Sequence, residues 1–136
     1  MIQRLAIALA VALSASSLHA QDTTHEPDVL AQVKPGEKMK FDLQSVKKYG
    51  DIQGQFDVII NWSEDADLPK PKDYTPRRVR YLANCQDGTM TVAAVGIFDQ
   101  IGQISKTVVA PPRSLDPVKP EKGSEQSKWL QQVCMF

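Results

Sequence analysis

The chemistry that this chain could support begins with its two cysteines, Cys85 and Cys134, in a sequence of 136 residues. Residues 1–20 have the features of an export signal, and exported proteins fold in an oxidising compartment. An even pair of cysteines in such a protein predicts a disulfide, here between the middle of the chain and its C-terminal segment. The alternative is a pair of free or redox-active thiols, but the sequence has no Cys-x-x-Cys motif and no histidine beside either cysteine.

Catalysis by a histidine-dependent site has little support in this sequence. His25 is the single histidine outside residues 1–20, and it lies in the leader that we expect to be flexible, so we expect neither a Ser–His–Asp nor a Cys–His arrangement and no histidine-based metal site. The 16 acidic residues show no spacing that marks a pair flanking a cleft, as a glycosidase would need. We therefore expect a protein that is not an enzyme and that has no cofactor and no metal site.

An acidic cluster of Glu64, Asp65 and Asp67 lies in a polar, proline-rich stretch over residues 63–76. Clustered carboxylate oxygens are the ligands that Ca²⁺ prefers, so a calcium site is one interpretation. However, no glycine follows the cluster to form a tight ion-binding loop. A long solvated loop is therefore the interpretation that the sequence favours.

Two arginines, Arg78 and Arg80, follow this loop in a segment with the alternation of a strand. That alternation places both guanidinium groups on the face opposite Cys85. Together with Lys72 and Tyr74 of the preceding loop, they are the candidate partner-binding residues, and the partner would be acidic. The alternative is that these side chains form the solvated outer face of a half-buried sheet.

The N-terminal segment has the three parts of a secretory signal. Arg4 supplies a positive charge, residues 5–13 form an unbroken apolar run, and a stretch of small residues ends at Ala20. The apolar run is too short to span a bilayer core, which needs roughly 20 residues, so we expect a cleaved signal peptide at 1–20 rather than a retained membrane anchor. No cysteine lies at the expected cleavage point, which predicts a periplasmic or secreted protein that is not lipid-anchored and has no transmembrane segment.

Charge and length limit the remaining possibilities. The chain has 16 basic and 16 acidic residues, and removal of the signal peptide with its single arginine leaves a net charge of −1. A chain so balanced lacks the electrostatic footprint of a protein that binds nucleic acid or anionic lipid. The mature length is that of one domain, and we expect a flexible leader at residues 21–38 followed by a domain over 39–136.

The pattern of apolar residues predicts about five strands and one helix. The expected strands span residues 39–46, 56–62, 78–85, 90–98 and 104–110. Apolar residues at helical spacing, preceded by Ser124 as a cap, predict a helix that ends near residue 135. The expected fold is of the α+β class and mainly antiparallel β, a meander with the C-terminal helix packed on one face.

The dipeptide Asp87-Gly88 predicts a two-residue hairpin turn between the third and fourth strands, because glycine tolerates a positive φ. Such a turn would place Cys85 opposite Met90 and Tyr81 opposite Ala94. Cys85 would then lie on the face that buries apolar groups, as a bond to the C-terminal helix requires.

Several segments follow a spaced pattern that is similar to a known family. They are RVRYLANC at 78–85, VGIFDQIGQ at 95–103, APPRSLDPVKP at 110–120, WLQQVC at 129–134 and the stretch 41–62. In the last of these, Asp42 and Ser45 have the spacing of a family Asp-x-x-Ser strand end. On these residues the chain resembles the surface-adhesin protein E family of Gram-negative bacteria, over nearly all of residues 39–134.

The resemblance implies a small β-rich domain whose C-terminal helix is tied by one disulfide. The best-known family member is an outer-membrane lipoprotein that binds host matrix and serum proteins, and haem binding has been ascribed to it. This chain lacks that member's lipidated cysteine. Haem ligation here by His25 or a tyrosine would rest on the resemblance alone, and we predict no cofactor.

Two functions from different classes remain open at this point. The first is an exported non-catalytic binding module that adheres to a host matrix or envelope protein, and the resemblance favours it. The second is a periplasmic accessory or structural protein with no surface adhesive role, which the missing lipid anchor favours. The sequence does not predict an oligomeric state.

Overall fold

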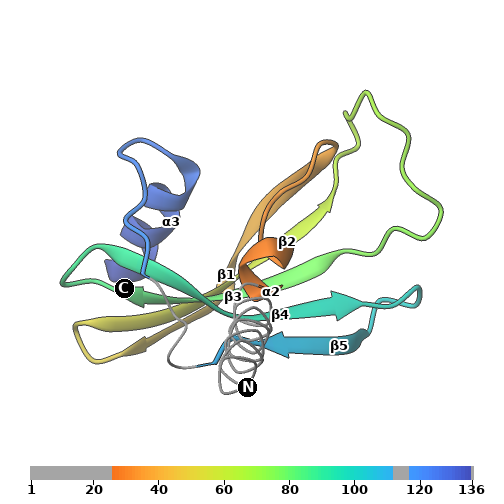
Figure 1. Ribbon diagram of the computed structural model, residues 1–136. Coiled ribbons are helices and arrows are strands. Elements are labelled where there is room, and N and C mark those ends of the chain that lie inside the picture. Colours follow the sequence, from red (N-terminus) through yellow and green to blue (C-terminus); the bar gives the residue numbers. More distant parts are fainter. Residues whose placement is uncertain (1–25, 112–116, 136) are drawn as a thin grey trace, which may run out of the picture.

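A computed structural model describes residues 26–111 and 117–135, so the predicted signal peptide lies outside the described residues. Its centre is a five-stranded antiparallel sheet in which each strand pairs with the next along the chain (Figure 1). The elements are α2 (Glu26–Leu30), β1 (Glu37–Tyr49), β2 (Gln53–Trp62), β3 (Arg77–Asn84), β4 (Thr89–Phe98), β5 (Ile104–Val109) and α3 (Glu125–Cys134). The predicted mainly-β meander with a C-terminal helix on the sheet is confirmed. None of the described helices is both long enough and apolar enough to span a bilayer.

The hydrophobic core lies between one face of the sheet and α3. Along β3, the alternating residues Val79, Tyr81 and Ala83 are buried, because successive side chains of a strand point to opposite faces. Phe56, Tyr81 and Trp129 form an aromatic cluster, with the rings of Phe56 and Tyr81 stacked at a centroid distance of 5.3 Å. Trp129 is therefore a packing anchor of α3, as its position at the edge of the apolar stripe suggests.

The hairpin between β3 and β4 differs from the predicted register. Asn84 pairs with Thr89 and Tyr81 pairs with Val92, so Cys85 does not lie opposite Met90 and Tyr81 does not lie opposite Ala94. The expectation of a two-residue turn was therefore wrong. Four residues, 85–88, connect the strands.

Side-chain hydrogen bonds explain this longer turn. The side-chain oxygen of Asn84 accepts from the N–H groups of Gln86 and Asp87, which holds the chain in a turn before Gly88. Gly88 has a φ of +69° and donates its N–H to the Asn84 carbonyl at 2.9 Å. The N–H of Cys85 bonds instead to the carbonyl of Ile52, in the β1–β2 turn.

The segment over residues 26–38, which we expected to be irregular, contains regular structure. It forms α2, in which Pro27 is buried, and it supplies the first two residues of β1. Leu30 and Ala31 pack against the core cluster, so this segment covers part of the sheet face that also carries α3. Its order comes from long-range contacts, described below, that a local pattern does not reveal.

Helix α3 begins at a cap and is held to the sheet by a close approach and a covalent bond. The Ser124 side chain accepts from the N–H of Ser127 and caps the helix as predicted. A Cβ on Gly54 would lie 2.6 Å from a methyl group of Val133, so only glycine lets the helix approach β2 this closely. Cys85 and Cys134 form the predicted disulfide, with their Cα atoms 5.5 Å apart.

Candidate functional site

The face of the sheet opposite α2 and α3, which we call the outer face, carries the two arginines singled out in the sequence. Cross-strand pairing aligns its residues in two adjacent rows. One row consists of Lys40, Ile59, Arg78, Gly96 and Thr107, and the other of Asp42, Asp57, Arg80, Ala94 and Val109. The second row is charged at all three strands β1 to β3, the first is charged in β1 and β3 but has Ile59 in β2, and both rows carry uncharged residues in β4 and β5.

Asp57 fixes the positions of both arginines. Its carboxylate is 4% exposed and accepts from Nη1 of Arg78 at 3.1 Å and from Nε of Arg80 at 3.0 Å. Nη1 of Arg78 also donates to Asp42 at 3.2 Å. The bonds that Arg80 donates to Asp57 raise the pKa of its guanidinium above the ordinary value. The two cations are thus held in a fixed geometry on a rigid sheet.

Asp42 and Asp57 are cross-strand partners, and an irregularity in β1 follows directly after this pair. The register between β1 and β2 shifts between Asp42 and Lys47. The hydroxyl of Ser45 donates to the carbonyl of Asp42 at 2.6 Å and accepts from the N–H of Asp57 at 2.7 Å. The Asp-x-x-Ser spacing at Asp42 and Ser45 therefore has a structural role beside the arginines.

A small hollow lies next to the two guanidinium groups. Ala94 and Gly96 form its floor, and Ile104 and Thr107 of β5 border the side away from the arginines. Its volume is about 130 Å³, which admits a small side chain rather than a drug-sized ligand. Within the described part of the chain, Nη2 of Arg78 and Nη1 of Arg80 form no hydrogen bond. Both groups can therefore donate to a ligand, and Arg80 is 48% exposed.

Tyr74 lies on the other side of the sheet, in a second charged cluster. Its hydroxyl donates to Glu37 at 2.5 Å, and Arg77 donates to the same carboxylate at 2.8 and 2.9 Å. Arg77 also donates to the carbonyls of Leu30 and Gln32. The Arg77 side chain is 9% exposed and that of Glu37 is 1% exposed. This cluster joins α2, β1, β3 and the 63–76 loop, so Tyr74 serves to anchor the loop.

Lys72 is exposed on the 63–76 loop, which projects beyond one end of the sheet (Figure 1). The structure therefore brings Arg78 and Arg80 together but not Tyr74 or Lys72 with them. The acidic cluster of Glu64, Asp65 and Asp67 lies on the same loop. Among residues 26–111 and 117–135, no group of three or more candidate ligands is arranged to hold a metal ion.

Sequence reasoning missed Asp57, Ala94 and Gly96. Asp57 is a single acid within the apolar strand segment FDVIINW, and it has the parity of the outward-facing residues. An isolated acid at such a position could have suggested a partner among the arginines on the same face. The hollow had no comparable signal, because small residues in a strand are common.

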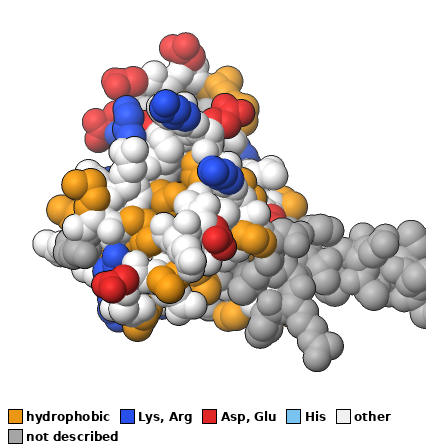
Figure 2. Space-filling model, turned by 90° about the vertical axis from the view of Figure 1, so that its left-hand side faces the viewer, with side chains coloured by type: hydrophobic (Ala, Val, Ile, Leu, Met, Phe, Trp, Pro, Cys, Tyr) orange, Lys and Arg blue, Asp and Glu red, His pale blue; other side chains and the backbone are white. Residues whose placement is uncertain are grey.

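The surface charges are mixed rather than separated. Figure 2 shows the end of the molecule that lies on the left in Figure 1, where basic and acidic side chains are interspersed with hydrophobic ones. No patch of one sign dominates this view. This distribution agrees with the balanced composition and gives no electrostatic basis for binding nucleic acid on this side.

The comparison with protein families decides the relationship. Residues 29–135 match the family described as surface-adhesin protein E. The chain belongs to this family. The match confirms the resemblance seen in the sequence and covers most of the chain. Membership in the surface-adhesin protein E family implies an adhesion role, and adhesins are generally not catalytic. The family and the disulfide together indicate an extracytoplasmic location. No curated protein matches the chain in sequence.

The cluster around Glu37 gives a prediction about acid stability. Burial alone would raise the pKa of Glu37, but the hydrogen bonds from Arg77, Tyr74 and the Lys34 N–H outweigh burial and lower the pKa to about 2. A lowered pKa in the folded state stabilises the protein above the ordinary pKa of 4.5, and this stabilisation is lost as the pH falls toward 2. The expected loss from this group is about 3 kcal/mol.

The measurement is denaturant unfolding of the wild type and of Glu37→Gln between pH 7 and pH 2. The variant should be less stable at pH 7, and the difference between the two proteins should shrink as the pH falls. Comparing the two proteins cancels the titration of the other carboxylates. A difference that stays constant over this pH range would contradict the assigned role of Glu37.

Proposed function

We propose that this protein is an exported, non-catalytic binding module that adheres to a host matrix or envelope protein through its outer face. The observation that supports this most strongly is the pair of guanidinium groups of Arg78 and Arg80 beside the hollow over Ala94 and Gly96. A carboxylate of the partner would enter the hollow and accept hydrogen bonds from both arginines. Asp57 holds the two cations in position before binding, so the loss of side-chain conformational entropy on binding is small.

The alternating strand pattern also supports a site on this face. The core occupies the opposite face, so neither of the described helices α2 and α3 packs on the outer face, and β3 is its central strand. Binding residues that sit on a rigid scaffold are positioned more precisely than residues on loops. Lys72 and the rest of the 63–76 loop lie beyond one end of the sheet and would contribute at the margin of such an interface, where charges mainly raise the rate of association.

The best variant for a test fills the hollow and leaves the arginines in place. From the sequence alone, reversing Arg78 and Arg80 to glutamate is expected to be nearly neutral for stability. The structure shows that both contact Asp57, so the reversal would set new acids beside a buried one and destabilise the sheet. Ala94→Leu avoids this, and Gln53→Leu adds the same side chain to an exposed position of the outer face far from the hollow.

We expect Ala94→Leu to weaken binding of the purified protein to immobilised host matrix proteins by about tenfold or more, because hydrogen bonds to charged groups contribute about 1.5–3 kcal/mol. Gln53→Leu should bind like the wild type. Surface plasmon resonance at two salt concentrations gives both affinities and the expected decrease in affinity at high salt. Equal binding by the Ala94→Leu variant, with its fold intact by circular dichroism, would remove the hollow as the site.

Location requires a separate test, because an adhesin must reach the cell surface. Intact cells that express the protein are treated with a protease, and the protein is then detected by immunoblotting. Cleavage in intact cells is the expected result. Protection in intact cells, together with cleavage after the outer membrane is permeabilised, would support a periplasmic accessory role instead.

A further inference from the structure

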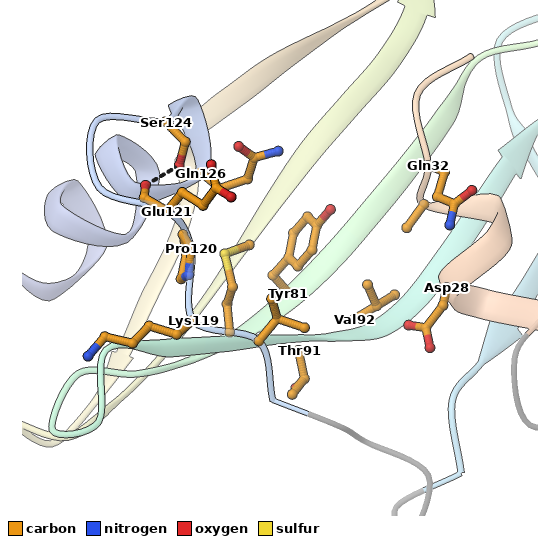
Figure 3. Close-up of a pocket in the computed structure, with 13 residues that line it drawn as sticks. Asp28, Gln32, Tyr81, Thr91, Val92, Lys119, Pro120, Glu121, Ser124 and Gln126 are labelled. Carbon is orange, nitrogen blue, oxygen red and sulfur yellow. Dashed lines mark hydrogen bonds between the residues drawn. The ribbon is translucent and has the colours of Figure 1, made fainter.

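A second candidate site lies on the opposite side of the sheet, between α2 and the segment that leads into α3. This groove, which we call the helix groove, has a volume of about 520 Å³. Its floor includes Tyr81 and Val92, and its two walls carry Asp28 and Gln32 on one side and Glu121 and Gln126 on the other. Figure 3 shows these walls facing each other across Tyr81. The volume lies within the range of sites that bind small ligands or short peptide segments.

Tyr81 is the most informative residue of the helix groove. Its side chain is fixed by stacking on Phe56 and by contact with Trp129, and the residue is only 9% exposed. Its hydroxyl nevertheless points along the groove (Figure 3) and forms no hydrogen bond with any described residue. No buried side-chain polar atom of the described residues lacks a partner, so this unbonded hydroxyl is reached by solvent in the groove. A phenylalanine would fill the same space in the core, so the hydroxyl is a polar group available to a ligand.

The charges of the helix groove favour a cation. Asp28 and Glu121 contribute carboxylates, and neither takes part in an ion pair with another described residue. Burial, together with the nearby charge of Asp28, raises the pKa of Tyr81 to about 12, so the hydroxyl stays protonated and neutral. Lys119 also lines the groove, but its amine lies at the far end of the segment before α3, away from Asp28 and Tyr81 (Figure 3).

We propose that the helix groove binds an arginine side chain presented by an extended segment of a partner protein. The aliphatic stem of the arginine would lie on Val92 and Met90. Its guanidinium would donate to the carboxylate of Asp28 and to the hydroxyl oxygen of Tyr81. The amide side chains of Gln32 and Gln126 can pair with the backbone of the bound segment. Arginine fits better than lysine because its planar group donates in several directions at once.

This inference does not depend on the site proposed on the outer face. The sheet separates the two sites, and they differ in the charge that they recognise. A failure of one therefore leaves the other to its own test.

The test uses the purified protein and two synthetic peptides, acetyl-Leu-Arg-Leu-amide and its citrulline analogue. Citrulline has the shape of arginine without the charge, so the comparison isolates the ionic contribution in the wild-type protein. We expect the arginine peptide to bind about tenfold or more tightly than the citrulline peptide in calorimetric or NMR titrations. Equal affinities, or no binding of the arginine peptide at millimolar concentration, would overturn the proposal.

Three variants assign the contacts. Asp28→Asn should lower the affinity for the arginine peptide by about tenfold and leave the affinity for the citrulline peptide unchanged. Tyr81→Phe should weaken binding several-fold, since it removes only the hydroxyl and preserves the aromatic packing. Asp51→Asn, which changes an exposed acid in the β1–β2 turn, is the matched control and should bind like the wild type. Unchanged affinity in Asp28→Asn or in Tyr81→Phe, with the fold verified by circular dichroism, would overturn the contact assigned to that residue.

Discussion

Arg77→Leu is expected to lower the free energy of unfolding by about 3–5 kcal/mol, because it leaves the carboxylate of Glu37 buried without its cation. The substitution also removes the donors to the carbonyls of Leu30 and Gln32, so the attachment of α2 to the sheet should be lost as well. A change of this size corresponds to a fall in melting temperature of roughly 10–20 °C. Thermal unfolding followed by circular dichroism measures it directly.

Arg80→Leu is the matched control for this prediction. It removes the same type of side chain from the same strand, but Arg80 is 48% exposed and Asp57 keeps Arg78 as a partner. We expect a loss of only about 1 kcal/mol from this variant. A similar loss in the two variants would contradict the claim that burial of the Arg77–Glu37 pair makes the difference.

The second large effect is expected from the disulfide. Cys134→Ser should lower stability by about 3–4 kcal/mol, because the bond closes a loop between residues 49 apart and restricts the unfolded chain. The melting temperature should fall by roughly 10–20 °C. Cys85→Ser should give the same loss, and the double variant should be no less stable than either single variant.

The same measurement distinguishes the stability that the disulfide contributes from the stability that the packing of α3 contributes. Trp129, Leu130 and Val133 bury the apolar side of α3 against the sheet, so the helix has contacts of its own. An unchanged melting temperature in Cys134→Ser would show that these contacts alone hold the helix. Intact-mass measurement under non-reducing conditions confirms that the wild-type sample is fully oxidised before the comparison.

The strands and α3 could be predicted from the sequence because their signals are local. Alternation placed Val79 and Tyr81 on the buried face, and the oxidising compartment implied by the N-terminal segment predicted the disulfide. The hairpin register could not be predicted in the same way. It depends on hydrogen bonds from the Asn84 side chain and on the bond between the Cys85 N–H and Ile52, a residue of another turn.

Long-range contacts also explain why residues 26–38, which we expected to be part of a flexible leader, form regular structure. Residues 26–38 have no periodic pattern, and their structure depends on Arg77, whose bond to the Leu30 carbonyl joins residues 47 apart in sequence. The candidate site likewise has features that local sequence patterns predict and features that depend on long-range contacts. Strand alternation predicted that Arg78 and Arg80 would share the outer face. It could not predict that Asp57 fixes them or that Ala94 and Gly96 leave a hollow beside them.

The most direct test of the adhesive site is an NMR titration of the ¹⁵N-labelled protein with the peptide acetyl-Gly-Asp-Glu-Gly-amide. We expect saturable chemical-shift changes at the backbone amides of Ala94, Gly96 and Thr107, together with changes at the side-chain N–H groups of Arg78 and Arg80. The neutral peptide acetyl-Gly-Asn-Gln-Gly-amide should cause much smaller changes. Equal shifts with both peptides, or shifts confined to other parts of the molecule, would contradict the proposal that the outer face binds an acidic partner.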